Sequence, residues 1–210
     1  GSGKPVSYIT KNHYAALNMI ANNNWERPIY FAVTTGPESY MGLQDHFRLE
    51  GLAYRLVPVK KPKNENPNIL GYIATDIMYD NVMNKWEWGN MDDVEHGIYM
   101  DENNRRMVTN VRLQMSNLAE SLLKEADPVR ALAVLDELLR ATPRENVPYS
   151  RVMMPVAEAY MQLAADVAVA PNTEGFSADD RAHAWAMTQQ VTNHFMKMQE
   201  ELVAYFTSLD

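Results

Sequence analysis

Residues 24–58 read NWERPIYFAVTTGPESYMGLQDHFRLEGLAYRLVP, and this stretch decides the fold of the first part of the chain. Ile29–Thr34 is β-branched and aromatic and is apolar on both faces, and Pro28 precedes it where a missing N–H does least harm to a sheet. Leu52–Val59 is a second candidate strand. Between the two, Leu43–Glu50 has a helix-like pattern that is long enough for a crossover. We therefore predict a small βαβ-like unit, with an antiparallel strand pair as the alternative.

Helical spacing of apolar residues predicts three further helices. The first runs from about Lys11 to Asn22 and ends in three asparagines, which tolerate the left-handed conformation at a helix end. A second is predicted from Asp76 to Trp86, and a third begins near Asp101. The apolar positions of the third helix are Met107, Val111, Met115, Leu118 and Leu122.

A helical hairpin is predicted where Asp127-Pro128 restarts the chain, because Asp is a favoured N-cap and Pro fits the first helical position. With Pro143 as the closing proline, this hairpin fits the pattern of a tetratricopeptide repeat of about 34 residues. The matching positions are Met115, Leu118, Ala119, Leu122, Ala126, Ala131, Leu135 and Leu138. Met115 stands where Trp is usual, and Leu138 stands where Ala is usual.

A second, interrupted hairpin follows the first. Its first helix places Val156, Ala157, Tyr160 and Ala164 on repeat positions, and an insertion at residues 166–176 separates its two helices. Ser177 and Asp180 have the spacing of a capping box, which predicts a last helix from about Ala178 to Ser208. An ordinary helical bundle with coincidental spacing is the alternative to a repeat.

The fold class predicted from these patterns is α+β. A small βαβ-like unit, residues 4–100, would pack on a mainly α-helical, tetratricopeptide-like unit, residues 101–210.

Composition excludes several classes of function. The chain has 210 residues, a formal net charge of -8 and no cysteine, which excludes disulfides, thiolate metal sites and cysteine nucleophiles. Nucleic acid is not expected as a partner, because its binding requires clustered positive charge. The basic cluster Lys60-Lys61-Pro62-Lys63 lies in a Pro/Asn-rich stretch that runs to Asn68, and we interpret it as a solvated loop rather than a lipid-headgroup contact. The chain opens with Gly1-Ser2-Gly3, so we expect a piece of a longer protein.

Residues typical of catalysis or metal binding are sparse. His183 and His194 share a helix face but lie too far apart to bind one ion. Asp76 and Asp80 lie one turn apart and could hold a cation, although an N-cap and a solvent-facing residue are the simpler interpretation. The acidic run 92–96 fits a solvated turn. We therefore predict no catalytic residues, no metal and no cofactor.

The middle of the chain is rich in aromatic residues, namely Tyr72, Tyr79, Trp86, Trp88 and Tyr99. Large rings of this kind most often fill a core. Exposed indole rings can also stack on sugar rings, so Trp86 and Trp88 are an alternative carbohydrate-binding site.

Several segments resemble the C-terminal soluble region of a family of bacterial multi-spanning membrane proteins similar to protein O-mannosyltransferases that use lipid-linked sugars. These segments are Trp25-x-Arg27-Pro28-Ile29-Tyr30-Phe31-Ala32, Gly42-Leu43-Gln44, Leu49-Glu50-Gly51-Leu52-Ala53-Tyr54-Arg55-Leu56, Thr75-Asp76-Ile77-Met78-Tyr79-Asp80-Asn81 and Asp101-Glu102-Asn103-Asn104-Arg105-Arg106-Met107. The resemblance implies that the membrane-spanning, catalytic half lies N-terminal to this region and that this region lies on the extracytoplasmic (periplasmic) side.

The resemblance also implies a non-catalytic role, which we expect to be binding or positioning an acceptor or partner protein. The membrane-spanning half of the same chain is a second expected partner. In tetratricopeptide arrays the first helix of each hairpin lines a concave groove. The groove residues predicted here are Ser116, Glu120, Lys124, Arg151, Glu158 and Gln162. The competing functions are a carbohydrate-binding module and a structural domain that stabilises the membrane half.

Overall fold

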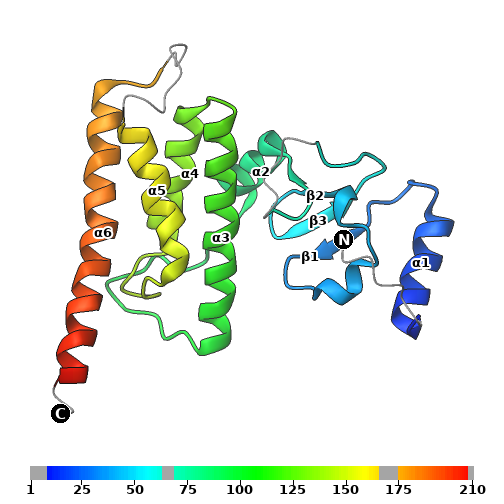
Figure 1. Ribbon diagram of the computed structural model, residues 1–210, viewed down its shortest axis with the longest axis horizontal. Coiled ribbons are helices and arrows are strands. Elements are labelled where there is room, and N and C mark those ends of the chain that lie inside the picture. The colour runs from blue at the N-terminus through cyan, green and yellow to red at the C-terminus, as the bar shows by residue number, and fades with distance from the viewer. Residues whose placement is uncertain (1–8, 63–68, 166–174, 208–210) are drawn as a thin grey trace. The chain divides into compact units, whose positions relative to one another are not determined.

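The computed structural model describes residues 9–62, 69–165 and 175–207, and the chain forms two compact units, Gly1–Met78 and Tyr79–Asp210 (Figure 1). The end of the predicted basic loop, residues 63–68, lies outside the described residues. Most of the insertion predicted at residues 166–176 lies outside them as well.

Residues 79–100 group with the helical unit, whereas the boundary predicted at residue 100 placed them in the first unit. Asn146 holds this segment: its Nδ2 donates to the carbonyls of Met91 and Asp93, both at 2.9 Å, and its Oδ1 accepts from Ile98 N. Asn146 lies about 50 residues after this segment, so local sequence patterns give no indication of these bonds.

The first unit contains a four-stranded sheet of order β1-β3-β2-β4. Its elements are α1 (Lys11–Asn23), β1 (Tyr30–Ala32), β2 (Phe47–Leu49), β3 (Ala53–Leu56), β4 (Tyr72–Ile73) and the first four residues of α2 (Thr75–Asp80), with short 3₁₀ helices at Pro37–Tyr40 and Gln44–His46. The α+β class is therefore confirmed, and α1 ends as predicted, with Asn24 in the left-handed conformation (φ 51°).

The predicted helix at Leu43–Glu50 is wrong, because this segment forms a 3₁₀ turn and then β2. Phe47, Arg48 and Leu49 alternate buried, half-buried and buried, which is the two-residue period of a strand. The loop between β2 and β3 is too short to join parallel strands, so these strands form a hairpin. β1 also pairs antiparallel with β3, which is the alternative to the βαβ-like unit.

Phe47 lies at the centre of the core of the sheet unit. It is fully buried, and its ring lies 4.9 Å from that of Phe31, 5.2 Å from that of Tyr40 and 5.5 Å from that of Tyr54. Rings at these separations gain packing energy beyond their buried area. Phe31, Tyr40, Phe47 and Tyr54 therefore form one cluster that contacts both strands of the β2–β3 hairpin.

Gly71 is required just before β4. Its backbone is left-handed (φ 66°), and a Cβ at this position would overlap the carbonyl oxygen of Phe47. Only glycine combines this conformation with so close a backbone approach. Gly71 thus permits β4 to pair in parallel with β2, at Arg48↔Tyr72 and Leu49↔Ile73.

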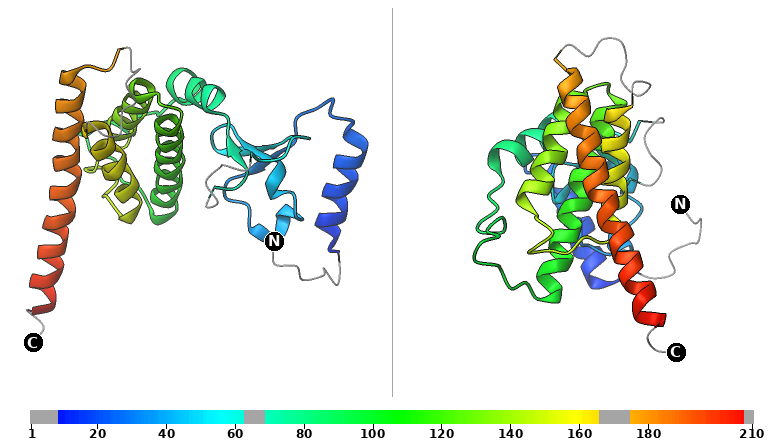
Figure 2. Two further views of the ribbon diagram at one scale, coloured as in Figure 1. Left: turned by 45° about the horizontal axis from the view of Figure 1, so that its top comes forward. Right: turned by 90° about the vertical axis from the view of Figure 1, so that its left-hand side faces the viewer.

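The second unit is helical. Its elements are the π-helix Asn81–Lys85, α3 (Glu102–Lys124), α4 (Pro128–Ala141), the 3₁₀ helix Arg151–Met153, α5 (Met154–Ala164) and α6 (Ala178–Thr207). The helices α3 to α6 run alternately up and down (Figure 1). α3 packs on α4 and α5, and α5 packs on α6. α6 is much longer than α5, and the C-terminal part of α6 extends beyond α5 (Figure 2).

The predicted start signals of these helices are confirmed. Asp101 caps α3 by accepting from Asn104 N at 2.8 Å, and Asp127 caps α4 ahead of Pro128. Ser177 and Asp180 form the reciprocal bonds of a capping box at the start of α6. The predicted second helix differs, because α2 ends at Asp80 and continues as the π-helix.

Most positions of the predicted repeat pattern lie in the core of the helical unit. Those with fully buried side chains are Met115, Leu118, Ala119, Leu122, Ala131, Leu135 and Leu138. Ala126 is instead exposed in the turn between α3 and α4, with a left-handed backbone (φ 59°). Met107 is also exposed, so the apolar face of α3 begins at Val108. The repeat register itself stays a prediction.

Enlarging Ala131 to leucine is expected to lower the free energy of unfolding by about 1 to 3 kcal/mol, because a fully buried alanine on α4 leaves no room for three more carbons. Thermal unfolding followed by circular dichroism should show a melting temperature several degrees lower. Val129→Leu, at an exposed position of the same helix, is the matched control. Equal melting temperatures for both variants would contradict the tight packing of α4.

Candidate functional site

The predicted groove residues lie on α3, on α5 and, for Arg151, on the 3₁₀ helix just before α5, and α3 contacts both of the latter elements. Lys124 is exposed at the end of α3 and pairs with Glu120 one turn earlier, with 2.6 Å between Nζ and Oε1. Glu158 and Gln162 are exposed one turn apart on α5, and Arg151 is exposed just before it. The exposed members of the predicted groove therefore carry charges of both signs.

Ser116 does not belong to this surface. It is only 2% exposed, although the repeat pattern places it in the groove. α3 packs on both α4 and α5, so its buried face is wider than one helix contact requires. Ser116 lies one turn after the buried Arg112, on the part of α3 that this packing covers.

Exposed apolar residues of the same helices were missed by the sequence analysis. Met154 and Met161 lie two turns apart on α5 and flank Glu158, and Leu113 is exposed on α3. Methionine adapts its shape to different partners and is common at binding surfaces. The three residues do not share the helical spacing of the buried positions on α3 and α5, and this mismatch is the sequence pattern that indicates their exposure. We define the α3–α5 surface as Leu113, Glu120, Lys124, Arg151, Met154, Glu158, Met161 and Gln162.

A buried arginine fixes the loop that leads into α5. Arg112 of α3 is 1% exposed, and its guanidinium donates to Thr142 Oγ1 at 3.0 Å and to the Thr142 carbonyl at 2.7 Å. It also donates to the carbonyls of Val147 at 2.7 Å and of Pro148 at 3.2 Å. The loop between α4 and α5 is thus hydrogen-bonded to α3, which sets where α5 begins.

All four hydrogen-bond acceptors that the described residues offer to the Arg112 guanidinium are neutral. Burial lowers the pKa of its guanidinium to about 10, while the neighbouring Tyr149 acts in the opposite direction. The ring of Tyr149 lies 5.3 Å from the guanidinium carbon, which adds a cation–π contact. The group therefore remains charged at neutral pH, and its hydrogen bonds compensate for the cost of burial.

A second network joins three helices. The hydroxyl of the buried Tyr160 on α5 donates to Asp136 Oδ1 on α4 at 2.8 Å, and His183 Nε2 on α6 lies 3.0 Å from the same oxygen. Burial and the neighbouring carboxylate raise the pKa of Tyr160 well above its usual value. Tyr160 therefore stays protonated as a donor, and the network holds α5 in place. His183 thus has a structural contact, and the ring of His194 instead meets that of Tyr149 at 5.1 Å.

Trp86 and Trp88 lie together at the end of the π-helix. Their rings meet edge to face at 5.5 Å, and both side chains are partly exposed. Trp86 N donates to Asn81 O at 2.9 Å, which closes the last wide turn. Short π-helices occur frequently at functional sites. The pair could offer one ring face to a ligand, although each ring also covers the other.

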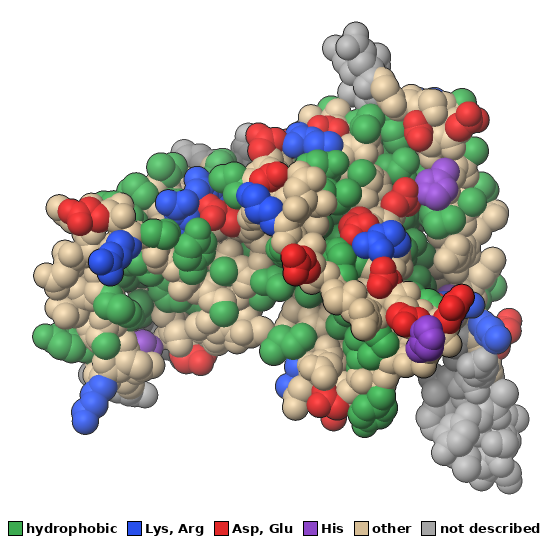
Figure 3. Space-filling view, turned by 180° about the vertical axis from the view of Figure 1, so that it is seen from behind, with side chains coloured by type: hydrophobic (Ala, Val, Ile, Leu, Met, Phe, Trp, Pro, Cys, Tyr) green, Lys and Arg blue, Asp and Glu red, His purple; other side chains and the backbone are tan. Residues whose placement is uncertain are grey.

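The candidate carboxylate sites behave as local structural groups. Asp80 lies 2.5 Å from Lys85 Nζ, and these contacts lower its pKa. Asp93 accepts from the backbone N of His96, and Asp92 pairs with Arg140 at 2.6 Å. Figure 3 shows acidic and basic side chains interspersed in this way over one face of the helical unit. Among the described residues, no three His, Asp or Glu side chains are grouped so that they could hold a metal.

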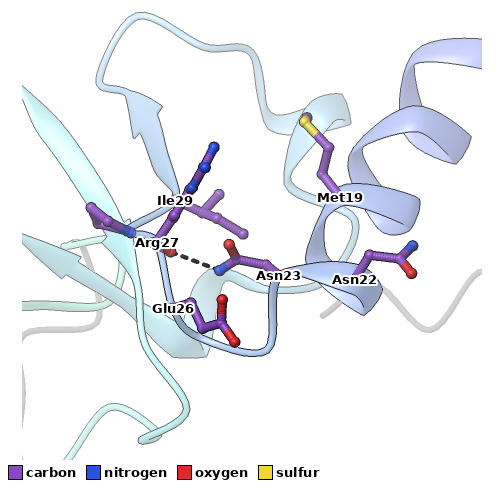
Figure 4. Close-up of a pocket in the computed structure, with 7 residues that line it drawn as sticks. Met19, Asn22, Asn23, Glu26, Arg27 and Ile29 are labelled. Carbon is purple, nitrogen blue, oxygen red and sulfur yellow. Dashed lines mark hydrogen bonds between the residues drawn. The ribbon is translucent and has the colours of Figure 1, made fainter.

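A hollow of about 480 Å³ opens at the end of α1 in the sheet unit. It is lined by Met19, Asn22, Asn23, Glu26, Arg27, Pro28 and Ile29. Figure 4 shows Met19 and Ile29 facing the space between α1 and the segment that follows it, and Asn23 bonded to the Arg27 carbonyl at 2.7 Å. The hollow is a shallow, mixed polar and apolar surface that lacks any pair of side chains arranged as nucleophile and base.

The turn beside this hollow has an unusual backbone. Asn24 and Trp25 are both left-handed, with φ of 51° and 60°. This conformation is uncommon for a large aromatic residue, and its cost must be met by the surrounding contacts. It leaves the Trp25 side chain 55% exposed. Sequence patterns predicted the asparagine but not the tryptophan.

Within the described ranges, no helix combines the length and the apolar character needed to cross a bilayer.

Residues 4–77 match the family model of TMEM260-associated domain 2, which covers roughly a third of the chain. The matched region coincides with almost the whole of the sheet unit. No curated protein and no solved structure matches the chain.

Proposed function

We propose that this chain is a non-catalytic domain of a membrane glycosyltransferase-like protein and that its helical unit binds or positions an acceptor or partner protein. The match of residues 4–77 to TMEM260-associated domain 2 supports the first part, because TMEM260 is a protein O-mannosyltransferase-like membrane protein. In this proposal the domain lies on the extracytoplasmic side, where sugar donor and acceptor meet.

The α3–α5 surface is the observation that carries the second part. Two helices from successive hairpins touch, as in helical-repeat proteins. α3 leaves Leu113 and Lys124 exposed, and α5 leaves Met154, Glu158 and Met161 exposed. Arg112 and Tyr160 hold these helices through buried hydrogen bonds, so the surface is formed before a partner arrives. A preformed surface avoids the entropy cost of ordering side chains and loops on binding. An extended acceptor segment with carboxylates fits Lys124 and Arg151.

Carbohydrate binding by Trp86 and Trp88 is the second candidate function. The observation that favours it is the partly exposed indole pair at the end of the π-helix. A stabilising role for the membrane-spanning half of the protein is the third, and it requires no ligand.

Reversing two charges of the α3–α5 surface tests the proposal. We expect Lys124→Glu with Arg151→Glu, in the intact membrane protein, to lower sugar transfer to a folded acceptor protein by up to about tenfold. Exposed charges contribute about 0 to 1 kcal/mol each, and their effect falls with added salt. Transfer to a short peptide that contains only the modified residue should be unchanged.

The matched control is Lys85→Glu with Arg144→Glu, which makes the same change of net charge at exposed, paired positions of the same unit. Equal transfer by both double variants to both acceptors would remove the α3–α5 surface from the function. Equal loss with protein and peptide would instead favour a role in sugar handling or in stabilising the membrane half.

A further inference from the structure

Charge is distributed unevenly along the chain. Residues 1–25 contain two lysines and no aspartate or glutamate, so all 27 acidic residues lie between residues 26 and 210. The formal charge of the whole chain is -8, yet this first segment is basic. α1 lies within it and carries a single charged residue, Lys11. This end of an acidic protein would therefore be attracted to a negatively charged surface.

α1 also buries none of its side chains. His13, Ala16, Ile20 and Asn23 are half-buried at helical spacing, which identifies the face of α1 that meets the rest of the sheet unit. Tyr14 and Leu17 lie one turn apart beside this face and are 69% and 39% exposed, whereas the exposed Met19 lies on the other side of α1 and lines the hollow. A helix of 13 residues with an uncovered apolar stripe is marginal in water by itself, so contacts within the unit keep it formed.

Further apolar side chains are exposed just before and just after α1. Ile9 precedes the helix and is exposed, and Trp25 follows it on the left-handed turn. Tryptophan and tyrosine favour the boundary between water and lipid, because each has an apolar ring and a polar tip. With this left-handed backbone, the Trp25 indole ring is exposed to solvent next to the end of α1. Figure 3 shows that hydrophobic side chains are exposed over the sheet unit as well as over the helices.

We propose that α1 and the Trp25 turn form a lipid-binding surface, with α1 lying in the plane of a bilayer that carries anionic headgroups. Tyr14, Leu17 and Trp25 would enter the headgroup region, and Lys11 would contact lipid phosphates. α1 carries Lys11 and no Asp or Glu, and the charges of Glu26 and Arg27 in the following turn offset each other. With so few charges, the exposed tyrosine, leucine and tryptophan would supply most of the attraction to a lipid surface, and the lysine would add a smaller electrostatic part. The proposal is independent of the function assigned to the α3–α5 surface.

Vesicle binding by the 210-residue chain tests this proposal. With vesicles of phosphatidylcholine and phosphatidylglycerol, we expect co-sedimentation and a blue shift of tryptophan emission, both weakened by added salt. Vesicles of phosphatidylcholine alone should bind much less. In Trp25→Phe the blue shift should disappear while co-sedimentation persists, because the other tryptophans lie outside the surface. Absence of binding to the anionic vesicles would overturn the proposal and leave a protein partner as the occupant of this face.

A double variant locates the contact. Tyr14→Gln with Leu17→Gln should lower the partition coefficient by about tenfold, because both apolar side chains are lost while both positions remain exposed and helical. Met196→Gln is the control, since Met196 is 60% exposed on α6 and lies outside the proposed surface. Circular dichroism should be the same for all three proteins. Equal lipid binding by the double variant and the control would show that α1 is not the binding element.

Discussion

Replacing Arg112 by alanine is expected to lower the free energy of unfolding of the helical unit by about 3 to 5 kcal/mol. The change leaves three backbone carbonyls and the Thr142 hydroxyl without their donor in a buried site, and it also leaves a cavity. Denaturant titration followed by tryptophan fluorescence measures the effect, because three of the four tryptophans lie in this unit.

The control for this prediction is Arg144→Ala, which removes an exposed arginine from the loop that Arg112 anchors. It should change stability by less than about 0.5 kcal/mol. Arg112→Lys separates geometry from charge, because an ammonium group cannot bridge acceptors as the planar guanidinium does. Full stability of the lysine variant would contradict the bridging role, and an alanine variant as stable as the control would contradict the anchor altogether.

Phe47→Ala is expected to cost about 3 to 5 kcal/mol in the sheet unit. Phe47 is fully buried and contacts the rings of Phe31, Tyr40 and Tyr54, so its removal opens a cavity that a short sheet cannot close. Amide hydrogen exchange of β2 and β3 measures the stability of this unit separately from that of the helices.

Two control variants accompany Phe47→Ala. Phe47→Leu keeps most of the volume and should cost about 1 to 2 kcal/mol. Leu52→Ala, at an exposed position beside the same hairpin, should have little effect. Exchange rates in β2 and β3 that are unchanged by Phe47→Ala would show that the aromatic cluster does not hold this sheet together.

Local sequence signals predicted the helices well and the sheet less well. Three helices begin with capping bonds that span only three residues, at Asp101, Asp127 and Ser177. Because both partners of each bond are close in the sequence, these helix starts can be predicted locally. The strand at Phe47–Leu49 was missed because a three-residue alternation is short enough to be mistaken for part of a helical pattern.

The candidate site could be predicted only in part, because burial depends on residues far apart in the chain. Glu120, Lys124, Glu158 and Gln162 lie at the surface, or partly so, as a repeat requires, whereas Ser116 is covered by packing with a neighbouring helix. The burial of Arg112 could have been predicted from the sequence, since Arg112 shares helical spacing with the buried Val108 and Met115. Its acceptors lie 30 or more residues later, where no local pattern indicates them.

The anchor formed by Arg112 also constrains how this sequence can diverge. Three of its four acceptors are main-chain carbonyls, which any residue supplies, so positions 147 and 148 can change identity without losing these bonds. Position 142 is limited to residues with a hydroxyl, and position 112 is limited to arginine. Among relatives that share the helical unit, we expect an invariant arginine facing a loop in which the side chains of Asn146 and Tyr149 are constrained by contacts of their own, whereas the carbonyls at 147 and 148 impose no residue type.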